Sequence, residues 1–119
     1  MGRTLVKICD NTFCSIVVVL HKKEEGCQVI GGCTFRIHKA EHIIELLLLG
    51  VKTQFQRSFG IGTKVVNALK RYASEQDMLK IVAYADWRAT GFFKKQDFVK
   101  LDVSQPENQT LDKLIHKCS

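Results

Sequence analysis

The sequence lacks the short motifs that mark metal sites and disulfide frameworks. No two of its five cysteines stand in a Cys-x-x-Cys pair, and an odd number argues against a closed set of disulfides. Its four histidines form no His-Glu-x-x-His pattern. We therefore expect reduced thiols and no bound metal.

Long apolar runs are also absent. No stretch approaches the ~20 apolar residues that are needed to span a bilayer. The first residues lack the charged-then-apolar pattern of a secretory signal. We therefore expect a protein of the nucleus or cytosol that has no membrane partner.

Basic residues outnumber acidic ones, 18 to 12, which gives a net charge of +6. Such a balance can attract nucleic acid, anionic lipid or a phosphorylated cofactor. The basic residues are spread along the chain, however, so we expect no direct contact with nucleic acid. A length of 119 residues allows one modest core, and we predict a single domain over residues 1–119.

The chain does contain three apolar segments that follow one another closely. Residues 13–20 are β-branched and apolar, which predicts a strand. Residues 27–37 predict a second strand, in which Gly31 and Gly32 suggest a bulge or a close backbone approach. Residues 43–51 form a near-continuous apolar run, typical of a strand covered on both faces. Polar turns separate the three segments, so we predict an antiparallel meander.

The pattern then changes to a helical period. Apolar residues recur at helical spacing over about 61–76, with polar residues on the opposite side. Shorter segments follow, and they predict a strand at 78–85, a short helix at 89–96, a last strand at 97–103 and a terminal helix at 109–117. The fold class is α+β, with a mixed, mostly antiparallel sheet of about five strands.

A glycine-rich turn, with Gly60 and Gly62, comes directly before the long helix. Backbone N–H groups at a helix N-terminus are unpaired and partly positive, and glycine lets an anion approach them closely. A dinucleotide fingerprint would need glycine at Val65, and a P-loop would need Lys-Ser/Thr at Thr63-Lys64. A third pattern, Arg/Gln-x-x-Gly-x-Gly/Ala, fits residues 57–62.

That third pattern resembles the pyrophosphate loop of the GNAT acyltransferases. Other segments resemble, in the same order, the PCAF-type histone (lysine) acetyltransferases of this superfamily: "VIGGCTFR" (29–36), "IIELLLLGV" (43–51), "AYAD" (83–86) and "GFFKKQDF" (91–98). The resemblance spans roughly residues 3 to 100. The first strand and helices of such a domain have no counterpart before Arg3, so the chain looks N-terminally shortened.

The resemblance implies a GNAT-like acyl-CoA N-acyltransferase fold that binds acetyl-CoA as the acetyl donor. Helices would cover both faces of the sheet, and the central strands that end near Val51 and Ala85 would splay apart. The cofactor would pair with the backbone near Leu49 and Val51, and the Leu49 N–H would polarise the thioester carbonyl. The loop residues would hold the pyrophosphate: Arg57, Ser58, Phe59, Gly60, Ile61, Gly62 and Thr63. The thiol end would be lined by Ala89, Phe92 and Phe93.

Glu45 is the one acidic residue in the apolar run of 43–51. A lysine substrate arrives as an ammonium with a pKa of about 10.4, and it must lose a proton before it can attack a thioester. A carboxylate surrounded by apolar residues is a better base than one in water. Glu45 matches the position of the catalytic glutamate of the family, so the resemblance implies the same role here. The alternative is a structural glutamate that pairs with a nearby lysine.

Three positions depart from the family pattern. Tyrosine is usual where this chain has Arg88 and Phe92, and glycine is usual at Asp97. The resemblance implies acetylation of a histone tail or another lysine-containing protein, in the nucleus and within a larger chromatin-modifying complex. Two other functions remain open: acetylation of a small-molecule amine or a protein N-terminus, and a catalytically weak module that binds coenzyme A or a partner protein.

Overall fold

The computed structural model describes residues 2–10, 13–24, 26–56, 60–101 and 104. Contacts divide the chain into two compact units, Met1–Tyr84 and Ala85–Ser119. The first unit holds a sheet and a long helix, and the second holds a short helix. The terminal helix predicted at 109–117 lies outside the described residues.

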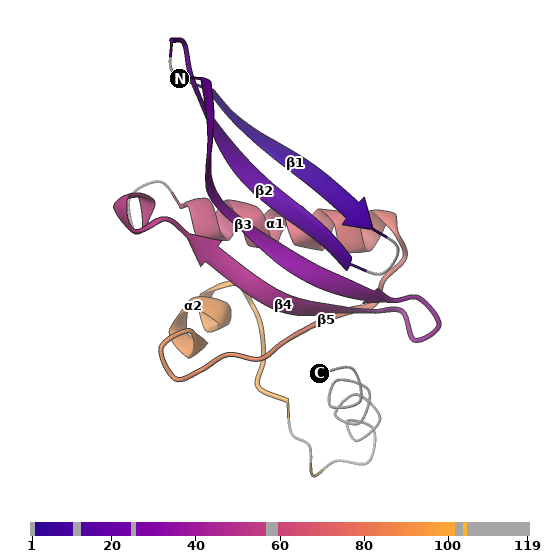
Figure 1. Cartoon of the computed structure of the whole chain (residues 1–119). Helices are drawn as coiled ribbons and strands as arrows, with labels where there is room; N and C mark the ends of the chain where they lie inside the picture. Colours follow the sequence, from indigo (N-terminus) through magenta and orange to yellow (C-terminus); the bar gives the residue numbers. More distant parts are fainter. Residues whose placement is uncertain (1, 11–12, 25, 57–59, 102–103, 105–119) are drawn as a thin grey trace. The chain divides into compact units, whose positions relative to one another are not determined.

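Five strands form the sheet of the first unit, in chain order from one edge to the other (Figure 1). Neighbouring strands are antiparallel except β4 and β5, which are parallel. The predicted mixed, mostly antiparallel sheet is therefore confirmed, as is the meander over 13–51. The strands are β1 (Gly2–Asp10), β2 (Phe13–Lys22), β3 (Gly26–His38), β4 (Ile43–Val51) and β5 (Lys80–Ala83).

Strand β1 was not predicted from the sequence. It pairs with β2 along its whole length, and this register places Cys9 opposite Cys14. Cys14 is disulfide-bonded, whereas Cys27 and Cys33 are free thiols. The expectation of reduced thiols is therefore wrong for Cys14, because the spacing of cysteines in the sequence does not show which of them the fold brings together.

Helix α1 (Ile61–Glu75) matches the helix predicted at about 61–76 and packs against β2, β3, β4 and β5. Its buried stripe has helical spacing: Ile61, Val65, Val66, Leu69 and Ala73. The Phe35 ring of β3 lies 5.4 Å from the Tyr72 ring of α1. The sheet face that carries Phe35 is therefore the one that α1 covers. A short 3₁₀ helix, η1 (Thr53–Phe55), lies between β4 and α1.

Two bulges adjust the central strands. Val18 pairs with Gly31 and Val19 with Val29, so Ile30 is an extra residue in β3. Thr34 pairs with Leu48 and Phe35 with Leu46, so Leu47 is an extra residue in β4. The bulge and close approach suggested by the glycines of β3 are both present, because a Cβ on Gly32 would lie 2.5 Å from the Ile16 carbonyl oxygen.

Strand β4 has two halves with different surroundings. Ile43–Leu46 pair with β5 on one side and β3 on the other, and all four residues are buried. Pairing with β5 ends at Leu46 and Ala83, and no described strand pairs with residues 47–51 on that side. The predicted splay of the central strands is confirmed. Burial of the whole apolar run is not, because Leu47 and Leu48 are exposed.

In the second unit, α2 (Thr90–Lys95) confirms the short helix predicted at 89–96. The strand predicted at 97–103 is wrong over its described part, residues 97–101, which contain no strand. Asp97 has φ of +67°, and the Phe98 N–H donates to the Phe93 carbonyl, so the chain turns back on the helix. Glycine suits a positive φ, which explains why the family pattern has glycine at this position. No helix in the described parts of the chain is long and apolar enough to cross a membrane.

Candidate active site

Glu45 lies buried in the paired half of β4, with 4% of its surface exposed. It pairs with Arg36 across the β3–β4 ladder, so both side chains project from the sheet face opposite α1. The His38 Nε2 atom lies 3.1 Å from Glu45 Oε1, and Arg36 Nη1 lies 3.9 Å from the same oxygen. The carboxylate is therefore held from one side by two groups of β3.

The other carboxylate oxygen, Oε2, has a different environment. The contacts of Glu45 with the described residues go to Oε1, and no buried side-chain nitrogen or oxygen of these residues lacks a hydrogen-bond partner. Oε2 has no partner among the described residues, so it is not sealed off and keeps access to solvent. An oxygen that is accessible at the edge of a buried carboxylate can accept a proton.

Sequence reasoning assigned no role to His38, and it named Arg36 only within a motif. The sequence did contain evidence for this face, because residues 36 and 38 are two apart on a strand and their side chains therefore point to the same side of the sheet. The short turn after His38 then brings Glu45 back opposite Arg36. The register could not be fixed in advance, so the contact between His38 and Glu45 was missed.

Leu49 and Val51 lie in the unpaired half of β4, where the cofactor backbone contacts were predicted. Both side chains are half-buried. The Gln56 side chain donates to the Val51 carbonyl at 2.9 Å, and the Lys52 N–H donates to the Ile30 carbonyl at 2.8 Å. Residues 47–51 therefore pair with β3 on one side, whereas their other side is anchored at its end and faces no strand of the described residues.

The N-terminus of α1 follows this edge. Gly60 has φ of +60° at the N-cap position, and its carbonyl accepts the Lys64 N–H at 3.0 Å. No side chain caps the helix and no acidic residue lies in its first turn, which leaves this end suited to an anion. Ile61 is fully buried and anchors the turn, Gly62 is half-buried and Thr63 is exposed. Arg57, Ser58 and Phe59 lie outside the described residues.

The remaining predicted residues belong to the second unit. Asp86 Oδ1 accepts the N–H groups of Arg88 and Ala89 at 2.9 and 3.0 Å, and the Ala89 N–H is the main reason why the pKa of Asp86 is lowered. Phe93 is buried and packs edge-on against Phe92, with ring centroids 5.4 Å apart. Their contact with the thiol end of a cofactor stays a prediction.

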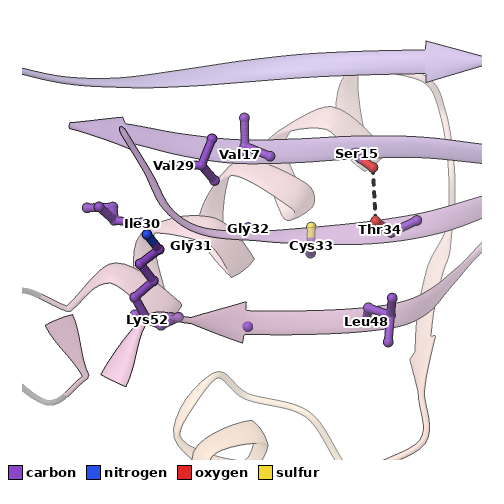
Figure 2. A pocket seen from close by; sticks show the side chains of 12 residues that line it. Ser15, Val17, Val29, Ile30, Gly31, Gly32, Cys33, Thr34, Leu48 and Lys52 are labelled. Carbon is purple, nitrogen blue, oxygen red and sulfur yellow. Dashed lines mark hydrogen bonds between the residues drawn. The ribbon is translucent and has the colours of Figure 1, made fainter. Parts of the chain in front are cut away.

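A cavity of about 430 Å³ opens on the first unit (Figure 2). Ser15 and Thr34, whose hydroxyl oxygens are 2.9 Å apart, lie at one end, and Lys52 lies at the other. Leu48 pairs with Thr34, and Thr34 lies two residues from Arg36 along β3, so these side chains share the sheet face of Glu45. The cavity and the carboxylate therefore lie on the same surface.

Strand β4, which parts from β5 beyond Leu46, and helix α1, which begins after the turn at Gly60, are arranged as expected of a GNAT-like fold. The sequence matches the acetyltransferase (GNAT) family over residues 4–98, and the chain belongs to this family.

Two proteins named GCN5 are among the relatives of this chain. The chain is 32% identical over 94 residues to the histone acetyltransferase GCN5 of Oryza sativa subsp. japonica, covering 78% of this chain and 17% of that protein. The crystal structure of Tetrahymena GCN5 superposes with a TM-score of 0.63 and 30% identity, covering 78% of this chain and 57% of the other. The chain thus spans about a sixth of the curated relative and little more than half of the solved one.

A more distant structure shares the fold alone. The putative streptothricin acetyltransferase of Bacillus anthracis, solved in complex with acetyl coenzyme A, superposes with a TM-score of 0.60 at 20% identity. The superposition covers 74% of this chain and 49% of the Bacillus anthracis protein. The fold therefore occurs in relatives named for a protein substrate and for a small molecule.

Proposed function

We propose that this chain transfers an acetyl group from acetyl-CoA to the side-chain amine of a protein lysine, with Glu45 as the general base. The observation that carries the proposal is the Glu45 carboxylate, buried in β4 with Oε1 held and Oε2 accessible. It lies one residue before Leu46, where the pairing of β4 with β5 ends. The proposed base and the strand segment that is open on one side are therefore neighbours on β4.

Features of the first unit fit acetyl-CoA. The unpaired edge of residues 47–51 offers backbone groups to an extended chain, as an open strand edge does for a peptide. The uncapped N-terminus of α1 offers N–H groups to a pyrophosphate. When bound, acetyl-CoA supplies a thioester, whose carbonyl carbon is open to attack by a neutral amine.

The residues of this chain would act on the amine and on the carbonyl. Glu45 Oε2 would take the proton of the substrate ammonium, directly or through a water. The backbone N–H of Leu49 would stabilise negative charge on the carbonyl oxygen. Gly60, Ile61, Gly62 and Thr63 would hold phosphate oxygens through the backbone.

Lysine is preferred as the acceptor because the GCN5 relatives are 30% and 32% identical to this chain, whereas the small-molecule enzyme shares the fold alone. A nuclear location and membership of a chromatin-modifying complex are proposals that rest on the same relatives. A small-molecule amine is the second candidate.

The test is a competition between acceptors. The protein is incubated with acetyl-CoA, a histone-tail peptide and an aminoglycoside, and the products are identified by mass spectrometry. We expect acetyl-lysine in the peptide, and a control peptide with arginine in place of lysine should stay unmodified. Acetylation of the aminoglycoside alone would overturn the lysine assignment. Binding of acetyl-CoA with no transfer to either acceptor would favour the binding module.

A further inference from the structure

We propose that His38 is a positioning residue for the base: its Nε2–H holds Oε1 of Glu45, so that Oε2 is the oxygen that accepts the proton. The inference rests on the proposed function and assigns a role to a residue that the family resemblance leaves without one. It concerns a contact between two buried side chains, since His38 is 9% exposed and Glu45 is 4% exposed.

The chemistry of the two groups fixes the direction of the hydrogen bond. An ionised carboxylate only accepts hydrogen bonds. The 3.1 Å contact between His38 Nε2 and Glu45 Oε1 therefore places the imidazole hydrogen on Nε2. His38 ends β3 opposite Ile43, the first residue of β4, and a turn of four residues joins the two strands. The short hairpin keeps the donor and the acceptor at a fixed separation.

Arg36 does not play the same part, although it approaches the same oxygen. Its Nη1 lies 3.9 Å from Oε1, which is too long for a hydrogen bond. The Arg36 guanidinium lies over the Phe13 ring, 4.5 Å from the ring centroid. Arg36 therefore adds positive charge near the carboxylate, whereas His38 sets its orientation.

This arrangement makes the two carboxylate oxygens unequal. Oε1 accepts the hydrogen bond of His38 and lies near the positive charge of Arg36, so His38 occupies this oxygen as an acceptor. Oε2 has no partner among the described residues and remains accessible. In the step that follows, the N–H bond of the substrate ammonium breaks and an O–H bond forms on Oε2. His38 keeps its own proton, and the proton on Oε2 then passes to water.

Two substitutions at His38 separate positioning from simple filling of space. His38→Phe keeps a ring but removes the donor, whereas His38→Gln keeps an N–H close to the position of Nε2. We expect kcat to fall roughly 10- to 100-fold for His38→Phe and by less than about threefold for His38→Gln. KM for acetyl-CoA should be unchanged in both. His42→Gln is the matched control, because His42 is exposed and its Nδ1 contacts a backbone carbonyl, that of Asp77. It should behave as wild type.

A double substitution tests whether His38 acts through Glu45. In a Glu45→Gln background, His38→Phe should cause no further loss of kcat, since there is no base left to position. An equal loss in both backgrounds would overturn the inference. So would full activity of His38→Phe while Glu45→Gln is impaired, and in that case the proposed function would stand. Normal turnover of Glu45→Gln itself would instead refute the base assignment in the proposed function.

A measurement without turnover covers the case in which His38→Phe does not fold. Nitrogen-15 NMR of the wild-type imidazoles reports which ring nitrogen carries the hydrogen. We expect the Nε2–H form for His38, and a shift of its signals in Glu45→Gln but not in His42→Gln. An Nδ1–H form for His38, or no response to Glu45→Gln, would contradict the contact.

Discussion

Gly32 lies where the backbone of β2 leaves no space for a side chain. A Cβ there would lie 2.5 Å from the Ile16 carbonyl oxygen and 3.1 Å from Val17 Cα, both backbone atoms that cannot move independently. We expect Gly32→Ala to lower the free energy of unfolding by roughly 1–3 kcal/mol, the usual cost of overpacking.

Gly50 is a matched control for this change, because it pairs with Gly32 across the β3–β4 ladder. A Cβ on Gly50 would meet nothing within 4 Å. Urea denaturation should therefore show Gly50→Ala within about 0.5 kcal/mol of wild type. Equal stability of the two variants would show that β2 and β3 are not in the close contact described.

The free cysteines among the described residues, Cys27 and Cys33, should differ in reactivity. Burial raises the pKa of the Cys33 thiol from 9.0 to about 11, with the Ile16 backbone opposing the shift. Because the thiolate is the reactive form, folded Cys33 should resist iodoacetamide at pH 8. Cys27 is exposed, with its sulfur 3.0 Å from His21 Nδ1, and should be alkylated.

Peptide mapping by mass spectrometry gives the outcome for each cysteine, and a sample in denaturant shows that Cys33 can react once exposed. The sign of the shift also predicts that folding is favoured by Cys33 below pH 9.0. This contribution should be lost as the pH rises through about 11. Labelling of folded Cys33 at the rate of Cys27 would contradict its burial.

At the scale of elements, the two halves of β4 should respond differently to cofactor. Residues 43–46 have strands on both sides, whereas residues 47–51 have a strand on one side. In hydrogen-exchange mass spectrometry, acetyl-CoA should slow exchange in peptides that cover 47–51 and 60–63. Exchange over 43–46 should stay slow with or without it. Protection by acetyl-CoA confined to β1 and β2 would place the cofactor elsewhere.

Strands and helices that have a clear hydrophobic pattern in the sequence were predictable. Elements that depend on pairing or packing with other segments were not. The predicted bounds of β4 coincide with the structure, and α1 ends within one residue of its prediction. The composition of residues 97–101 predicted a strand, but Asp97 turns the chain back on α2 and these described residues form no strand. The β-propensity is a property of single residues, whereas a strand forms only where a second strand is present to pair with it.

In the candidate site, too, some residues were predictable from the sequence and others were not. Glu45 was predictable because a lone carboxylate in an apolar run is conspicuous, and a family resemblance gave it a role. The role of His38 was not predictable, because its contact with Glu45 depends on the register of β3 and β4. The bulge at Leu47 and the hairpin turn together determine that register. The splay of β4 from β5 was predictable only through the resemblance, since no residue pattern marks where two parallel strands part.

At the scale of the molecule, the central claim is that this chain is a working acetyltransferase. It spans 57% of the Tetrahymena GCN5 structure, yet it contains the strand, the turn and the carboxylate that the proposed reaction needs. Its net charge of +6 suits an anionic cofactor. Activity therefore depends on whether this set of elements suffices for turnover.

The most direct measurement is the rate of coenzyme A release with a lysine peptide, for wild type and Glu45→Gln at saturating acetyl-CoA. The amide keeps the shape of the carboxylate but cannot take a proton. Turnover should fall roughly 10²- to 10⁴-fold while acetyl-CoA affinity, measured by calorimetry, stays unchanged. The variant should recover partly as the pH rises toward the lysine pKa of about 10.4, because more of the amine is then neutral. Near-normal turnover by Glu45→Gln would contradict the account.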